Sequence, residues 1–339
     1  MRFSVFAWTI SLMVILMFSS FLYFSYQSTT LGSTALVSNP KISTDSLPIF
    51  PVPESPTHDI AMVKLGFQLF NDPNLSSNGQ VSCESCHHIF EDGAEETKVS
   101  IGVLGVGARN SPTLYNINFN SRFFWDGRAA SLEQQIDGPI HNPVEMNSDW
   151  EKIITYVKDQ PNYQRDFKAL FKQGVSEESI KHALVIFMEM LNTPNSPFDQ
   201  YLQGDINALS TTAIIGWNKF QSLGCIVCHQ GINMGGNLYQ RFGNLHSGNM
   251  LEKELDLGRF NVTGNEADKL VFRVAGLRNV ADTPPYFHDG RAATLEEAIV
   301  TMANLQLGID LDSASIIEVS AFLESLSAPK PAILSELSQ

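Results

Sequence analysis

Two cysteine pairs, each followed directly by a histidine, carry the most specific chemistry in this 339-residue sequence. They read CESCH at 83–87 and CIVCH at 225–229, and together they use all four cysteines of the chain. The C-x-x-C-H spacing is the attachment signature of c-type haem, in which two thiols bind one macrocycle edge and the histidine turns back to the iron. The residues concerned are Cys83, Cys86, His87, Cys225, Cys228 and His229.

Two other uses of paired cysteines fit this pattern less well. A redox dithiol would not require a histidine after both pairs. A Cys₂His₂ zinc site needs its ligands around one metal, whereas these clusters lie about 140 residues apart. The sequence therefore predicts two covalently bound c-type haems.

The segment before each motif is predicted to be an amphipathic helix. Each segment carries a glycine and, four residues later, an aromatic residue: Gly66 with Phe70, and Gly216 with Phe220. This spacing puts both residues on one helix face, where glycine would allow another helix to approach closely.

Helical patterns recur at 151–172, 176–192 and 312–326, while strand signals are scarce. The fold class is therefore predicted to be mainly α.

One segment occurs twice with two informative changes. FFWDGRAASLEQQI at 123–136 returns as YFHDGRAATLEEAI at 286–299, with Trp125 replaced by His288 and Gln135 by Ala298. Asp-Gly predicts a turn in both copies, and the arginines are expected to pair with haem propionates or carboxylates. The repeat predicts two tandem cytochrome-c-like haem domains whose roles have diverged.

The N-terminus is predicted to be a membrane anchor or a signal segment. No charged residue occurs from 3 to 26, and a helix of this length, at ~1.5 Å per residue, would cover the ~30 Å hydrocarbon core. The lack of a convincing cleavage site favours a retained inner-membrane anchor over a cleaved signal, and both place the rest of the chain in the periplasm. The expected domains are an anchor or signal (1–30), a flexible linker (31–56), and two haem domains (57–200 and 201–330).

The chain is acidic, with a formal net charge of −14 and a pI near 4.9. This balance argues against nucleic acid as a partner, because the phosphate backbone attracts basic surfaces. It suits a basic protein partner, although acidity that only aids solubility is an equally good interpretation.

The chain resembles the bacterial di-haem cytochrome c peroxidases. The resemblance extends from about residue 60 to 326 and rests on LSSNGQVSCESCH, ARNSPTLYN, FFWDGRAASLEQQI, GPIHNPVEM, GCIVCH, LRNVADTPPYFHDGRAATLEEA and MANLQLG. It implies reduction of hydrogen peroxide to two waters with two electrons from an external donor. That donor would be a small cytochrome c, a cupredoxin or quinol, and the family is commonly dimeric.

The resemblance also implies roles for individual residues. His229 and Met302 would ligate the electron-accepting haem, where a thioether raises the reduction potential. The haem of His87 would be peroxidatic, with Glu145 as general acid/base and Gln135 orienting the peroxide.

Further residues match the family's inter-haem region. Trp125 corresponds to an aromatic residue between the haems, and His288 is expected near the edge of the C-terminal haem. A calcium site would use the Asn110 side chain with carbonyls at Thr283 and Pro285.

One departure from the family concerns the resting state. Many members carry a histidine that caps the resting peroxidatic haem, but Val103 stands at that place in VSIGVLGVGARN. We therefore expect a five-coordinate or water-bound iron that needs no reductive activation. His88 and His141 are nearby alternative ligands, each better interpreted as a surface histidine, and His182 is interpreted as a core or surface residue.

Two other functions remain open. Related enzymes that oxidise protein side chains, as in methylamine dehydrogenase maturation, replace the C-terminal methionine ligand with tyrosine, whereas this chain has Met302. A non-enzymatic electron carrier would normally have two six-coordinate haems, which the missing distal histidine and the pair Gln135 and Glu145 disfavour.

Overall fold

The computed structural model describes residues 48–245 and 256–338. The expected anchor at 3–26 and most of the expected linker lie outside this range. Within the described part of the chain, no helix is both long and apolar enough to cross a membrane.

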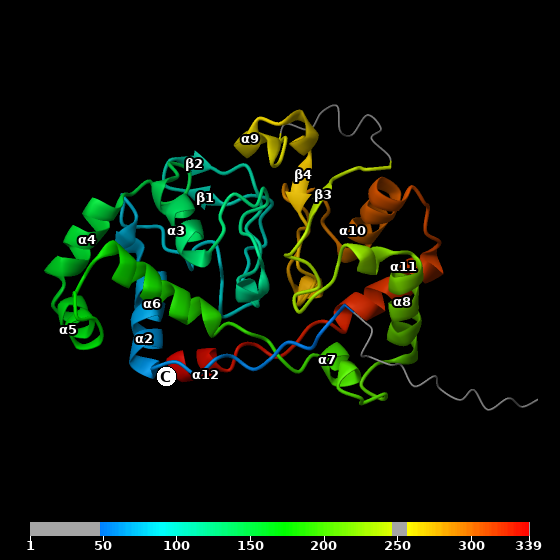
Figure 1. Ribbon diagram of the computed structural model, residues 1–339, viewed down its shortest axis with the longest axis horizontal. Coiled ribbons are helices and arrows are strands. Elements are labelled where there is room, and N and C mark those ends of the chain that lie inside the picture. Colours follow the sequence, from blue (N-terminus) through cyan, green and yellow to red (C-terminus); the bar gives the residue numbers. More distant parts are fainter. Residues whose placement is uncertain (1–47, 246–255, 339) are drawn as a thin grey trace, which may run out of the picture. The chain divides into compact units, whose positions relative to one another are not determined.

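The described chain is mainly helical, which confirms the predicted fold class (Figure 1). The helices are α2 (Ile60–Asn71), α3 (Leu132–His141), α4 (Trp150–Asp159), α5 (Pro161–Leu170), α6 (Glu177–Glu189), α7 (Pro197–Leu202), α8 (Thr211–Ser222), α9 (Phe260–Thr263), α10 (Leu295–Met302), α11 (Ser313–Glu324) and α12 (Ile333–Leu337). The strands form two antiparallel pairs: β1 (Ile101–Gly102) with β2 (Gly105–Val106) in a hairpin, and β3 (Tyr239–Arg241) with β4 (Val271–Arg273) across a long connection.

The pattern expected to be one helical stretch at 151–172 forms two helices. Helix α4 ends at Asp159 and α5 begins at Pro161, with Gln160 extended between them. Proline disfavours the helical conformation of the residue before it and is well suited to the first helical position. Pro161 therefore accounts for the break between α4 and α5.

The glycines of the two predicted haem-motif helices allow close helix packing, as the sequence indicated. A Cβ on Gly66 would overlap the carbonyl oxygen of Ala183 in α6, and one on Gly216 would overlap that of Glu318 in α11. Helix α2 therefore packs directly on α6, and α8 on α11, in the same manner.

The duplication extends to a shared hydrogen-bond centre. The side-chain amides of Asn116 and Asn279 both donate to the Thr193 hydroxyl, at 2.7 and 2.8 Å. Their carbonyl oxygens accept from the backbone N–H of Thr193 and of Ala328, at 2.9 and 3.0 Å. The asparagine seven residues before each repeated segment thus accepts a backbone hydrogen bond from the segment that follows α6 or α11.

The described residues form two large hydrophobic cores, and each is completed by a segment distant in sequence. The first contains residues between 63 and 191 together with Ile333 and Leu334 of α12. The second contains Ile49 and residues between 198 and 326. The N-terminal segment is held there by the Val52 N–H, which donates to Asp199 at 3.1 Å.

A valine at Gly216 should destabilise the fold. A side chain at position 216 would collide with the backbone carbonyl of Glu318 in α11. Helices α8 and α11 would have to move apart to remove this overlap, at a cost of about 1–3 kcal/mol or more. We expect Gly216→Val to lower the urea midpoint of the haem-loaded protein. The control Asn218→Val places the same side chain at an exposed position of α8; equal midpoints for the two variants would contradict the packing argument.

Candidate functional site

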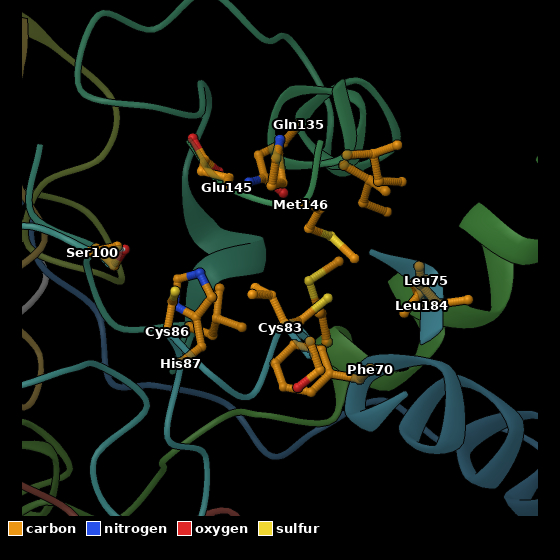
Figure 2. Close-up of a pocket in the computed structure, with 18 residues that line it drawn as sticks. Phe70, Leu75, Cys83, Cys86, His87, Ser100, Gln135, Glu145, Met146 and Leu184 are labelled. Atoms are coloured by element: carbon orange, nitrogen blue, oxygen red, sulfur yellow. Dashed lines mark hydrogen bonds between the residues drawn. The ribbon is translucent and has the colours of Figure 1, made fainter. Parts of the chain in front are cut away.

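One cavity brings together five of the predicted site residues. It is partly open to solvent and lined mainly by apolar side chains with a few polar groups, as small-ligand and cofactor sites commonly are. Gln135 and Glu145 lie together on one side of it, and His87 with the motif cysteines on the other (Figure 2). The full lining is Phe70, Leu75, Val81, Ser82, Cys83, Cys86, His87, Ser100, Ser111, Leu114, Gln135, Ile136, Pro139, Ile140, Glu145, Met146, Leu184 and Met188.

Local backbone chemistry aims Gln135 and Glu145 into the cavity. Ser131 caps α3, so Gln135 falls in its second turn. Pro139 has no N–H, so it cannot donate to the carbonyl of Gln135, four residues earlier. After the helix, the N–H of Met146 donates back to the Pro139 carbonyl at 3.0 Å, and this reversal directs Glu145 towards α3.

Glu145 is a half-buried carboxyl group with a mixed electrostatic environment. Burial raises its pKa, while the Asn142 amide, which donates to Oε1 at 2.6 Å, and the nearby Arg128 cation act in the opposite direction. These opposing effects suit a group that must both accept and release a proton.

The β1–β2 hairpin, which contains Val103, is bonded to the Glu145 segment. The Val103 N–H donates to the Glu145 carbonyl at 2.8 Å, and the Leu104 N–H donates to the Pro143 carbonyl at 3.1 Å. A Cβ on Gly102 would overlap the Val144 carbonyl, so the contact is close. The hairpin is therefore held against residues 143–145, and Val103 is not part of the cavity lining.

The two alternative histidines make other contacts. His141 Nδ1 lies 2.9 Å from the Asp137 carbonyl on the exposed side of α3. His88 lies 3.6 Å from Glu91, and neither histidine lines the cavity.

The first motif fits a haem iron. The His87 ring lines the cavity beside the Cys83 and Cys86 thiols, the arrangement that a haem attached to both cysteines would need. Burial lowers the pKa of His87 to about 4, which keeps the imidazole neutral, the form that binds metals.

The cysteines fit a redox dithiol or a zinc site less well. Burial raises the pKa of Cys83 to about 12 and that of Cys86 to about 11, so both thiols are protonated at neutral pH. Among the residues described, no group of three or more His, Cys, Asp or Glu side chains is placed to hold a metal ion.

The second motif lies near the paired strands β3 and β4. The Gln240 side chain of β3 lies near Cys228, where it opposes the rise that burial causes in the pKa of the thiol, and His229 Nδ1 lies 3.2 Å from the Met234 carbonyl. Burial lowers the pKa of His229, which favours the neutral ring.

An aromatic layer connects Met302 with Trp125. Both pack on the cluster Phe242, Phe272 and Leu305. The His288 ring stacks on Phe272 at 4.1 Å between centroids and meets Trp125 edge-on at 6.3 Å. Trp125 and His288, which occupy the same position in the two copies of the repeat, are therefore neighbours.

Trp125 and the candidate calcium residues share backbone contacts. The indole Nε1 donates to the Asn110 carbonyl at 2.9 Å, and the Asn110 N–H donates to the His288 carbonyl at 2.8 Å. Asn110 thus lies beside the segment that contains Thr283 and Pro285.

Sequence reasoning missed much of the cavity wall. Leu184 and Met188 are four residues apart on α6 and supply part of its apolar side, which the helical periodicity could have indicated. Ser100, whose hydroxyl bonds to Glu95 and lies 2.5 Å from that of Ser111, gave no signal.

Several known proteins are similar to this chain. Residues 60–207 match the sequence profile described as di-haem cytochrome c peroxidase. The chain is 43% identical to cytochrome c peroxidase Ccp of Escherichia coli (strain K12), over 82% of this chain and 61% of that protein. It is 42% identical to cytochrome c551 peroxidase of Nitrosomonas europaea, over 84% and 85% respectively. A crystal structure of a MauG-like protein associated with microbial copper homeostasis is similar at a TM-score of 0.72 and 27% identity, covering 82% of this chain and 93% of that one.

The chain therefore belongs to the di-haem cytochrome c peroxidase family, which confirms the resemblance found in the sequence. Membership implies two haems and the enzyme class of a cytochrome c peroxidase, an oxidoreductase.

Loss of the Asn142 amide should raise the pKa of Glu145. The hydrogen bond to Oε1 stabilises the ionised form, and a charge-assisted bond of about 1.5 kcal/mol corresponds to roughly one pKa unit. We expect the carboxyl infrared band to titrate at higher pH in Asn142→Ala, with Glu145→Gln identifying the band. An unchanged or lower pKa would contradict this account.

Proposed function

We propose that the cavity at His87 is the site where hydrogen peroxide is reduced to two waters, with two electrons and two protons consumed. The observation that carries the proposal is the convergence of His87, Gln135 and Glu145 on one cavity, next to the Cys83 and Cys86 thiols. The two haems of the family are proposed to be c-type, held covalently by these thiols and by Cys225 and Cys228.

The protein side chains would manage the proton and the orientation of the substrate. When bound, the haem at His87 supplies the iron that accepts peroxide and the electrons that cleave its O–O bond. Glu145 takes a proton from one peroxide oxygen and returns it to the other, so that the second leaves as water. Gln135 orients the peroxide by hydrogen bonding, and Arg128 favours the ionised form of Glu145.

Electrons would enter at the second haem, ligated by His229 and Met302, and pass the Trp125 indole. This route is supported by the packing of Met302 and Trp125 on one aromatic cluster. The donor is proposed to be a small cytochrome c, a cupredoxin or quinol, which the names of the relatives support only as far as cytochromes are concerned.

The first haem is proposed to be five-coordinate or water-bound when oxidised. Val103 cannot ligate iron, and the hydrogen bonds of its hairpin to residues 143–145 keep this segment beside Glu145. The open position would then be ready for peroxide without prior reduction.

The remaining organisation is also a proposal. Residues 57–200 and 201–330 would be the two haem domains, preceded by an anchor or signal (1–30) and a linker (31–56), and the enzyme would be periplasmic and dimeric. A calcium ion would bind between the haem domains at Asn110, Thr283 and Pro285, a site supported by the bond from Asn110 to the His288 carbonyl.

Oxidation of a protein side chain is the second candidate function, favoured by the similarity to a MauG-like structure. Met302, where such enzymes are expected to have tyrosine, and the higher identity to named peroxidases favour peroxide reduction.

Removal of the Glu145 carboxylate should abolish most of the activity. We expect Glu145→Gln to lower kcat/KM for peroxide by about 10²–10⁴-fold, the usual contribution of a positioned acid/base group. Steady-state turnover with a reduced artificial donor measures it. The control is Glu133→Gln, an exposed acid in the first turn of α3; wild-type turnover in Glu145→Gln would overturn the mechanism.

The oxidised enzyme should show a high-spin first haem and turn over peroxide without pre-reduction. Electron paramagnetic resonance and optical spectra of the resting enzyme test this directly. His88→Ala and His141→Ala should leave the spectra unchanged, because both side chains lie outside the cavity lining. A low-spin bis-histidine signal that either substitution removes would refute the open site.

A further inference from the structure

Arg273 is a buried cation for which the described protein supplies no anion. The residue lies in β4 and is 5% exposed. Its Nε donates to the Phe124 carbonyl at 3.2 Å, and its Nη1 lies 3.4 Å from the Val274 carbonyl. Among the residues that the structure describes, no carboxylate lies within ion-pair distance of its guanidinium.

Several other arginines near the site are paired with carboxylates, whereas the half-buried Arg241 of β3 donates to the exposed Ala267 carbonyl. Arg278, equally buried at 2% exposure, lies 2.8 Å from the fully buried Asp199. Arg128 and Arg291 are the arginines of the repeated segment. The sequence left open whether they bind propionates or carboxylates, and in the structure both contact carboxylates. These ion pairs are Arg109 with Asp126 and Asp256, Arg128 with Asp126, Arg259 with Asp268, and Arg291 with Asp289.

A buried charge without a counter-ion is energetically costly. Two neutral carbonyls offset only part of the lost hydration of a guanidinium, and buried charges in proteins are normally paired. Burial lowers the pKa of Arg273 to about 10, so the group is still protonated at neutral pH. The position therefore calls for an anion that is bound in the working protein.

The surroundings of Arg273 indicate which anion this is. Gln240, on the strand paired with β4, lies near Cys228 of the second motif. The His229 ring lies near the backbone of Ala275, two residues beyond Arg273. On the other side, the Arg273 N–H donates to the Trp125 carbonyl at 2.7 Å. The guanidinium thus belongs to a segment between the second haem motif and the tryptophan loop.

We propose that Arg273 binds a propionate carboxylate of the haem held by the second motif. The proposal rests on the proposed function in one respect, the presence of a haem at Cys225, Cys228 and His229. A planar guanidinium matches a carboxylate in geometry and charge, and each haem carries two such groups.

This contact makes Arg273 a positioning residue for electron transfer. One side chain would hold the haem edge, while its backbone N–H and Nε hold the carbonyls of Trp125 and Phe124. The fixed positive charge would also favour the reduced iron and keep the propionate ionised.

Equilibrium redox titration of the haem-loaded enzyme tests the proposal without relying on turnover. We expect Arg273→Gln to lower the midpoint potential of the second haem and to make it pH-dependent as the propionate begins to titrate. Arg273→Lys, which keeps the charge, should retain most of the potential. The control Arg241→Gln removes one charge from the adjacent strand β3, at a side chain that bonds only an exposed carbonyl, and should shift the potential less.

The outcomes separate this proposal from the proposed function. Absence of haem at the second motif in the wild-type protein, measured by haem staining after denaturation, would refute the proposed function itself. If both variants, Arg273→Gln and Arg273→Lys, bind haem and the midpoint potential of their second haem is unchanged, only the role of Arg273 is overturned. If Arg273→Gln cannot be produced with haem, a crystal structure of the wild-type holoenzyme decides. A propionate oxygen at Arg273 supports the proposal, and a protein carboxylate there overturns it.

Discussion

The exchange of backbone hydrogen bonds between the two repeat loops is the constraint on which the rest of the site depends. The Trp125 carbonyl accepts from the Arg273 N–H, and the His288 carbonyl accepts from the Asn110 N–H. Asn110 precedes Asn116 by the same interval as Arg273 precedes Asn279, so the two bonds are equivalent. Because each repeat holds the loop of the other, the aromatic layer between the motifs has a fixed geometry.

The equivalence also shows how one domain could acquire two roles. The two backbone bonds are counterparts of each other, which is the pattern of an isologous two-fold interface. Within that frame the side chains differ: an amide at Asn110 and a guanidinium at Arg273, an indole at Trp125 and an imidazole at His288. If the proposed calcium ion binds at Asn110 and Arg273 binds a propionate, a positive charge lies at the same place in both domains. In one domain it would be a metal ion, and in the other a guanidinium.

The sequence predicted what is local and missed what is assembled from distant parts. The cysteine motifs, the glycines of α2 and α8, and the tandem repeat follow from spacing within a few residues or from self-similarity. The isolation of Arg273 depends on tertiary packing and leaves no trace in the sequence. The helical spacing of Leu184 and Met188 marks an apolar face of α6, but only the tertiary packing assigns that face to the cavity. Pro161 is a local signal that was not used. A proline indicates a helix boundary, but the continuous apolar pattern at 151–172 favoured a single helix.

The completion of each core by a remote segment has a consequence for how the enzyme can be divided. Ile49 belongs to the core built by residues 198–326, while Ile333 and Leu334 belong to the core built by residues 63–191. A cut near residue 200 would therefore give two fragments, each carrying apolar residues that belong to the other. The halves are interlocked by their chain ends, and two separately synthesised haem modules would have to exchange these ends before either could close its core.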